Sequence, residues 1–270
     1  MLRRLAAAAC IAISLAIPAS AQYRTEARSE QSGLSASATA PYESDIIAAR
    51  PVRHLLGLLL GGYAFQHQGT FSPNCSCAYG EETGLRGLIG LDYGLHYPKL
   101  GFALHLGVQF HDYGADFSYG ETRMTRIAGT VPDTLIDYRK YSHVRIRLLR
   151  ISPGIEWYPG KSGVFLLAGL DVGYTLAARY DNIERIESGG WYEYPGGGPE
   201  TAYLTESDIP GADRLHIGAM LGAGVDIRLS DRFILTPRVA VTLPFNPVSS
   251  EDPDWKILSE QAALILYYRF

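Results

Sequence analysis

The sequence predicts an all-β protein, an eight-stranded antiparallel up-and-down transmembrane β-barrel. Three observations predict this fold. Apolar residues recur at every second position along several segments, and a helix, with a period of about 3.6 residues, could not gather them on one face. These segments run to about 12–16 residues, longer than the usual globular strand of about 5–6. The connections between them alternate between long and short.

The N-terminal region is predicted to precede the barrel. Two arginines come before an apolar run, residues 5–17, which is too short to span a membrane as a helix. A proline ends this run, and the small residues at 19–21 match the site that signal peptidase cleaves. We therefore expect residues 1–21 to be a cleaved signal peptide. Residues 22–53 are polar, with little periodicity, and are expected to form a periplasmic arm.

The barrel itself is predicted to span residues 54–270. The clearest segment is 215–229, in which every odd position is apolar. Segment 54–67 is apolar on both faces, so its orientation is not predicted. The alternation slips near residue 149, which predicts either a β-bulge or outward-facing Arg145 and Arg147 near the membrane surface. The predicted strands are residues 54–67, 85–97, 100–111, 143–157, 164–180, 215–229, 233–245 and 255–270.

The connections predict how the barrel is oriented. Tight turns at one rim and extended loops at the other are typical of outer-membrane barrels. The short connections are residues 98–99, 159–163 and 230–231, and we expect them, with both termini, in the periplasm. The long ones are residues 68–84, 117–142, 181–213 and 246–254, and we expect them outside the cell.

The polar face of the strands is expected to line the lumen. It is rich in glycine and carries scattered charges of both signs, whereas the water-facing surface of a soluble barrel would be rich in Lys, Glu and Thr. The lumen of eight strands is nearly filled by side chains. The apolar face carries aromatic residues near strand ends, as at a lipid interface: Tyr93, Tyr97, Trp157, Tyr174, Tyr180, Phe245, Tyr268 and Phe270. The predicted lumen polar network comprises Arg86, Asp92, His105, Arg150, Glu156, Asp171, His216, Asp226, Arg228 and Arg238.

The chain ends in ALILYYRF, residues 263–270, which alternates to its last residue. Leu264, Leu266, Tyr268 and Phe270 should face lipid, and this closing strand should pair with residues 54–67. The signal peptide, the eight long strands and the terminal aromatic resemble small bacterial outer-membrane β-barrels, namely the OmpX/OmpA-barrel and PorT-like families. The resemblance covers residues 54–270. It implies that the barrel-assembly machinery recognises the last strand, with Tyr268 and Phe270 as its assembly signal.

Metal and cofactor sites are not expected. The only cysteines after the signal peptide are Cys75 and Cys77, which could form a small, strained disulfide or stay unpaired within the chain. No CxxC or HExxH motif is present. Inward-facing His105, His111 and His216 could cluster around a metal, but such residues more often join a hydrogen-bonded interior.

The sequence predicts a role that does not depend on catalysis. Some outer-membrane barrels that modify lipid A use a His and a Ser near the outer rim, but Ser142 and His143 are adjacent and should face opposite sides of the sheet. We expect a structural or surface-interaction protein that works through its extracellular loops. A narrow pore or carrier for small solutes is the alternative, and a lipid A-modifying enzyme is the third.

The expected partners follow from the predicted location in the cell outer membrane. They are outer-membrane lipid, lipopolysaccharide and the barrel-assembly machinery, with the protein itself monomeric. The formal net charge of −4 disfavours nucleic acid as a partner.

Overall fold

The computed structural model describes residues 52–72, 79–125, 134–160, 162–187, 194 and 197–270. Within these ranges, no helix is long and apolar enough to cross a membrane. The strands are β1 Arg53–Gln68, β2 Glu82–Tyr97, β3 Phe102–Asp112, β4 Ala115–Thr125, β5 Thr134–Trp157, β6 Val164–Ile186, β7 Glu200–Asp208, β8 Leu215–Val225, β9 Ile227–Arg228, β10 Phe233–Pro244 and β11 Lys256–Arg269.

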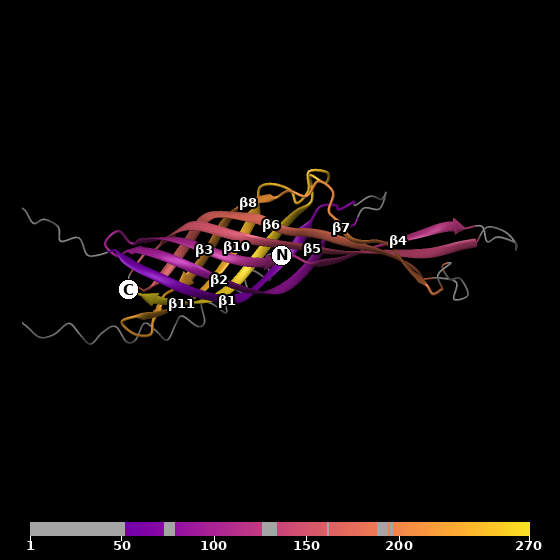
Figure 1. The fold of residues 1–270 in the computed structure, drawn as a ribbon. Coiled ribbons are helices and arrows are strands. Elements are labelled where there is room, and N and C mark those ends of the chain that lie inside the picture. Colours follow the sequence, from indigo (N-terminus) through magenta and orange to yellow (C-terminus); the bar gives the residue numbers. More distant parts are fainter. Residues whose placement is uncertain (1–51, 73–78, 126–133, 161, 188–193, 195–196) are drawn as a thin grey trace, which may run out of the picture.

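Eight of these strands close into a ring (Figure 1). Their order is β1-β2-β3-β5-β6-β8-β10-β11, and β11 returns to pair with β1. Every pairing is antiparallel, and the closing pair runs from Leu55 opposite Arg269 to Gln68 opposite Lys256. The predicted eight-stranded barrel and its closure by the last strand are therefore confirmed. The short β9 follows β8 and pairs with β10 at the rim.

The alternation places apolar residues outside and polar residues inside. On β11, Leu264 and Leu266 are 54% and 44% exposed, whereas Ile265 and Tyr267 are buried in the lumen. We call the outward apolar side chains of the eight barrel strands the apolar belt. Its exposed members include Leu58, Leu91, Leu106, Ile151, Leu170, Leu221, Leu243 and Leu264, one from each strand. An exposed apolar surface that encircles the molecule suits lipid and not water.

Strand β1, whose orientation the sequence left open, follows the same rule. Its outward residues Leu56, Leu58 and Leu60 are exposed, whereas Leu55 and Leu59 are buried. Both lumen-facing leucines belong to a buried apolar cluster that includes Tyr63 of the same strand and Tyr267 of the neighbouring β11.

A β-bulge interrupts the β5–β6 ladder. Arg147 pairs with Ala177 and Leu148 pairs with Thr175, so Leu176 is the extra residue. Arg145 and Arg147 face outward and are exposed, as one of the two alternatives predicted. The bulged residue itself lies on β6, and not near residue 149 of β5, where the sequence suggested a bulge. Beyond the bulge the inward positions of β6 change parity, and Tyr180 is therefore buried instead of facing lipid as predicted.

Two of the predicted long loops are largely strands, which corrects the sequence prediction. Within residues 117–142 and 181–213, β4 pairs with the far part of β5, and β7 pairs with the far part of β6. With the far ends of β5 and β6, which also pair with each other, they form a four-stranded sheet in the order β4-β5-β6-β7. This projecting sheet extends well beyond the barrel, at the end opposite the C-terminus (Figure 1). Both its faces carry polar residues, so the sequence shows no apolar alternation there.

The remaining domain predictions lie outside the described residues. These are the signal peptide at residues 1–21, almost all of the arm at residues 22–53, and the loop segment that contains Cys75 and Cys77.

Candidate functional site

The lumen is the candidate site that the sequence predicted, and most of the predicted residues meet there. The lumen contains Asp92, His105, Arg150, Glu156, Asp171 and Arg238 as buried residues and His216 and Asp226 as half-buried ones.

The structure corrects the prediction for two of the lumen residues, because both are exposed to solvent. Arg86 lies near the long-loop end of β2 and donates from Nη1 to the carbonyl of Leu85 (3.2 Å). Arg228 lies at the short-turn rim and forms an ion pair with Asp231. At a strand end, a long arginine side chain can reach water instead of remaining in the lumen.

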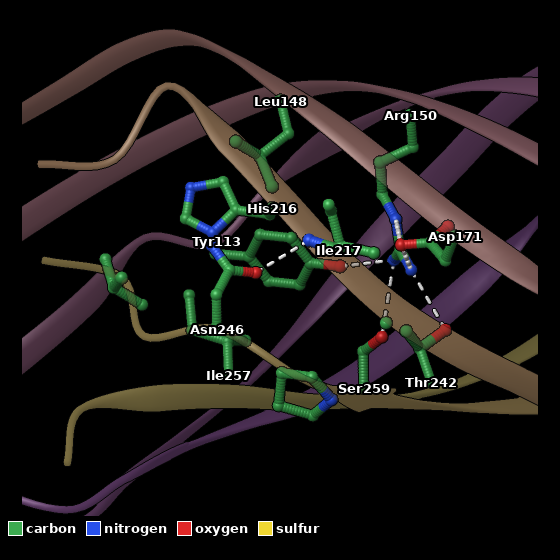
Figure 2. Close-up of a pocket in the computed structure, with 13 residues that line it drawn as sticks. Tyr113, Leu148, Arg150, Asp171, His216, Ile217, Thr242, Asn246, Ile257 and Ser259 are labelled. Atoms are coloured by element: carbon green, nitrogen blue, oxygen red, sulfur yellow. Dashed lines mark hydrogen bonds and ion pairs between the residues drawn. The ribbon is translucent and has the colours of Figure 1, made fainter. Parts of the chain in front are cut away.

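Arg150 anchors the first polar cluster of the lumen (Figure 2). Its Nε donates to Asp171 Oδ2 (2.7 Å) and its Nη2 donates to Thr242 Oγ1 (2.9 Å). Its Nη1 donates to the hydroxyl of Tyr113 (2.5 Å), and Ser152 Oγ donates to the other oxygen of Asp171 (2.8 Å). A buried ion pair is tolerated when further hydrogen bonds satisfy its remaining atoms, and this cluster meets that condition.

Asp92 organises the second cluster. It lies 3.2 Å from Arg238 Nη1 and 3.5 Å from His105 Nδ1, and it accepts a hydrogen bond from the hydroxyl of Tyr267 (2.7 Å). Glycines make room for these side chains. A Cβ atom at Gly154 would lie 2.3 Å from His105 Nε2, and one at Gly57 would lie 2.6 Å from the ring of Tyr267. This is the physical reason for the glycine-rich lumen face that the sequence shows.

The third cluster lies at the short-turn end. The hydroxyl of Tyr158 contacts Glu156 Oε2 (3.0 Å) and Asp226 Oδ2 (2.9 Å). A hydroxyl donates only one proton, so these two carboxyl groups share a single donor. Thr236 Oγ1 donates to the other oxygen of Asp226 (2.7 Å). Tyr158 and Thr236 thus supply the hydroxyl groups that contact the two acidic side chains at this end of the lumen.

Aromatic residues close the lumen at the long-loop end. Phe71, Phe117, Tyr79, His67 and Trp255 are buried there, and we call them the aromatic cap. The rings of Phe71 and Trp255 are 4.3 Å apart, and Trp255 Nε1 donates to His67 Nδ1 (3.1 Å). Burial lowers the pKa of His67 to about 4, so this imidazole is neutral at physiological pH.

A small cavity lies beside the Arg150 cluster (Figure 2). Its volume is about 30 Å³, which is room for one or two water molecules. Arg150, Asp171, His216 and Asn246 supply polar atoms to its wall, and Ile217 contributes to its apolar part. The cavity is too small for an organic solute.

The histidines do not meet as a group. His111 donates from Nε2 to Gln109 Oε1 (3.1 Å) and lies 3.1 Å from the hydroxyl of Tyr113, while His216 lies 3.1 Å from Thr175 Oγ1. Within the described residues, no three His, Cys, Asp or Glu side chains are arranged to hold a metal ion.

Ser142 and His143 also remain apart. Ser142 is buried on the inner face, whereas His143 faces outward and lies 2.7 Å from Asp116.

The aromatic end of the chain lies on the outer surface at the short-turn end. Phe270 is 65% exposed and Tyr268 is 38% exposed. The ring of Phe270 stacks on His54 with centroids 5.8 Å apart, and its backbone N–H donates to the carbonyl of His54 (3.3 Å). The last residue is therefore held against the first strand at the lipid-facing surface.

Sequence reasoning missed two tyrosines that join the polar clusters. Tyr113 directly follows β3 and Tyr158 directly follows β5, so both lie just past the alternating segments. Thr242 and Ser259 also contribute, and their positions on the inward parity of their strands would have identified them.

No protein-family model matches the chain, and no curated protein matches it. Several solved structures are similar in outline, among them the following three. Ail of Yersinia pestis is 12% identical, with 80% of this chain and 99% of that chain covered and a TM-score of 0.30. Neisserial surface protein A is 11% identical (81% and 97% covered, TM-score 0.32). The outer membrane protease OmpT from Escherichia coli is 6% identical (83% and 98% covered, TM-score 0.30).

Such low identities and TM-scores transfer no residue and no activity to this chain. The strand pairing and the exposure pattern are evidence in their own right. A closed ring of eight antiparallel strands, apolar outside and polar inside, is the architecture of a small outer-membrane β-barrel.

Proposed function

We propose that this protein is an anchored surface-interaction protein of the cell outer membrane, which works through the projecting sheet while its barrel acts as a filled, rigid support. The observation that carries this proposal is the projecting sheet itself. Strands β5 and β6 continue from the barrel without a break, over 24 and 23 residues, so the sheet is held by the same ladder that spans the membrane.

The filled lumen supports an anchoring role over transport. Three buried polar clusters occupy it along its length, and the aromatic cap closes it at the long-loop end. A solute would have to displace paired charges as well as the cap. A narrow pore for small solutes is therefore only the second candidate. The enzyme alternative has no site at Ser142 and His143, because these side chains lie on opposite faces of the sheet.

Side-chain contacts on the projecting sheet support an ordered binding surface. Arg123 forms ion pairs with Glu121 (2.9 Å) and Glu184 (3.1 Å), and its guanidinium lies over the ring of Tyr138. The hydroxyl of Tyr194 donates to Glu184 (2.7 Å), which ties the segment after β6 to the same face. Glu121 is thereby stabilised as an anion, because its hydrogen bond from Arg123 lowers its pKa.

The sheet also offers two strand edges. Within the described residues, β4 pairs only with β5, and β7 pairs only with β6. The outer edges of β4 and β7 therefore present backbone N–H and C=O groups that another extended chain could pair with. We propose that the partner is an extended segment of a protein at the cell surface.

Binding of random peptides to two forms of the detergent-purified protein tests this function. One form is the full chain, and the other lacks residues 118–141 and 182–207, which removes most of the projecting sheet and keeps Phe117 of the cap. We expect displayed peptides to be enriched on the full chain and not on the shortened barrel, with both forms migrating as compact species before boiling. Equal enrichment on both forms would contradict the proposal. Regular conductance steps in planar bilayers would favour the pore.

A further inference from the structure

Three arginines lie on the outside of the barrel wall, directly above the apolar belt. Arg145 and Arg147 belong to β5 and Arg179 to β6, and we call them the arginine cluster. Arg145 and Arg179 are direct cross-strand partners, and the three side chains are between 53% and 58% exposed. One outward position further toward the short turns, β5 presents Leu149, and on β6 the bulged Leu176 precedes the cluster.

This arrangement is unfavourable unless something compensates it, because like charges directly opposite each other destabilise a sheet. Four carboxylates lie close to the three arginines. Arg147 lies 3.3 Å from Asp112, Arg145 lies 3.4 Å from Asp181, and the distances from Arg179 to Glu206 and Asp208 are 3.6 and 3.9 Å. These contacts are long, and each occupies one of the five N–H groups of a guanidinium. Several N–H donors therefore remain to bind an oxyanion.

The cluster surrounds a cleft of about 330 Å³. Ala177 lies at its wall, and its small side chain leaves room between Arg147 and Arg179. Glu206 borders the cleft in a left-handed backbone conformation (φ 48°), and its N–H donates to Asp181 Oδ1 (2.5 Å). This hydrogen bond connects the backbone of β7 to the carboxylate that also contacts Arg145.

We propose that the cleft binds the phosphate group of a membrane lipid of the outer leaflet. The guanidiniums supply planar pairs of N–H donors, which match phosphate oxygens. The acyl chains of the same lipid would lie along Leu149, Tyr174 and Leu176 of the apolar belt below. The inference rests on the proposed membrane placement but not on the surface partner of the projecting sheet.

The same two strands provide a matched control. Arg139 and Arg185 are also direct cross-strand partners on the outward face, and they form ion pairs with Glu187 (3.1 Å) and Glu200 (3.3 Å). Arg139 is six residues from Arg145 along β5, which at about 3.3 Å per residue places it roughly 20 Å further from the belt. A lipid seated in the belt cannot bring its phosphate to this second pair.

The test compares R145Q/R147Q/R179Q with R139Q/R185Q and the unchanged protein. Each is purified in dodecyl maltoside, which has no phosphate, and titrated with phosphatidic acid while native mass spectrometry measures the lipid retained. We expect the triple variant to lose affinity by about tenfold or more, and the control pair to stay within about twofold. Heat-dependent gel mobility shows that each variant is folded. If the triple variant does not fold, the three single variants replace it, each with a smaller loss.

Four outcomes would overturn the proposal. The triple variant could bind like the unchanged protein, or the control pair could lose as much affinity, which would indicate general attraction of anions. Diacylglycerol of the same chain length could bind equally well, which would mean that the belt alone holds the lipid. Complete displacement of the lipid by millimolar inorganic phosphate would indicate a site for the free ion. None of these outcomes alters the expected peptide binding of the projecting sheet.

Discussion

Strands β5 and β6 pass through two environments along one ladder, which a single bulge interrupts. Between the short turns and the bulge at Leu176, their outward side chains form part of the apolar belt and their inward side chains meet a filled lumen. Beyond the bulge they enter the projecting sheet, where charged residues occupy both faces. In the first stretch, contacts with lipid and with the lumen restrict which side chains the strands can carry. In the second stretch, the side chains can vary without disturbing the barrel. Stability should therefore depend on the barrel and only slightly on the sheet.

The largest effect is expected in the Arg150 cluster. Arg150→Met would leave Asp171 buried without its cation, and breaking a buried pair in this way costs about 3–5 kcal/mol. Unfolding by urea in detergent micelles, followed by loss of the compact gel species, measures the change. The double variant R150M/D171N should recover part of the loss. A loss below about 1 kcal/mol for the single variant would show that the lumen network does not hold the barrel.

The aromatic cap should make stability depend on pH. The pKa of His67 falls from 6.5 to about 4 on burial, so the unfolded chain takes up this proton more readily than the folded one. Stability is therefore complete above about pH 6.5 and decreases as the pH falls toward 4, by up to roughly 3 kcal/mol. Urea unfolding between pH 7 and pH 4 measures the slope. His67→Gln keeps an acceptor for Trp255 and should remove this part of the slope, so an unchanged slope would exclude His67 as the cause.

A matched pair of glycine substitutions compares the two regions directly. Gly154→Ala would place a Cβ atom 2.3 Å from His105 in the lumen, and overpacking of this kind costs about 1–3 kcal/mol. At Gly120 on β4, an added Cβ atom meets nothing within 4 Å. Gly120→Ala should therefore leave the free energy of unfolding unchanged or raise it slightly. Equal losses from the two substitutions would contradict the division between a tightly filled barrel and an open sheet.

The smallest effect is expected on the projecting sheet. Arg123→Gln removes ion pairs whose arginine side chain is 37% exposed. Because solvent screens such pairs, the sheet should lose about 1 kcal/mol or less of its local stability. The substitution should increase hydrogen exchange in β4 without changing the unfolding of the barrel. A change in the global unfolding midpoint would mean that sheet and barrel unfold together.

The barrel could be predicted from the sequence because lipid requires an apolar residue at every outward position. That requirement produced the alternation on β11 and placed Asp92, Arg150 and Arg238 in the lumen. The requirement ends where the strands leave the membrane. Arg86 and Arg228 have inward parity but lie at strand ends and reach water.

The sequence could not reveal the projecting sheet or the cap for related reasons. In the sheet neither face needs to be apolar, so its strands resemble polar loops. The cap joins Phe71, Phe117 and Trp255 from three separate parts of the chain, and only the folded barrel brings them together. The change in inward parity that buries Tyr180 depends on a single extra residue, Leu176 of β6, whereas the sequence suggested a bulge only on the facing strand, near residue 149.

Cysteine scanning of the outward face of β5 tests the central claim most directly. In a C75S/C77S background, single cysteines replace Tyr141, Arg145, Leu149, Ile151 and Ile155, and a membrane-impermeant maleimide is applied to the barrel in lipid vesicles. A thiol reacts as its thiolate, which does not form in hydrocarbon. We predict rapid labelling at positions 141 and 145 and protection at 149, 151 and 155, with all five labelled after denaturation. Uniform labelling along the strand would contradict a lipid-facing belt that ends below the arginine cluster.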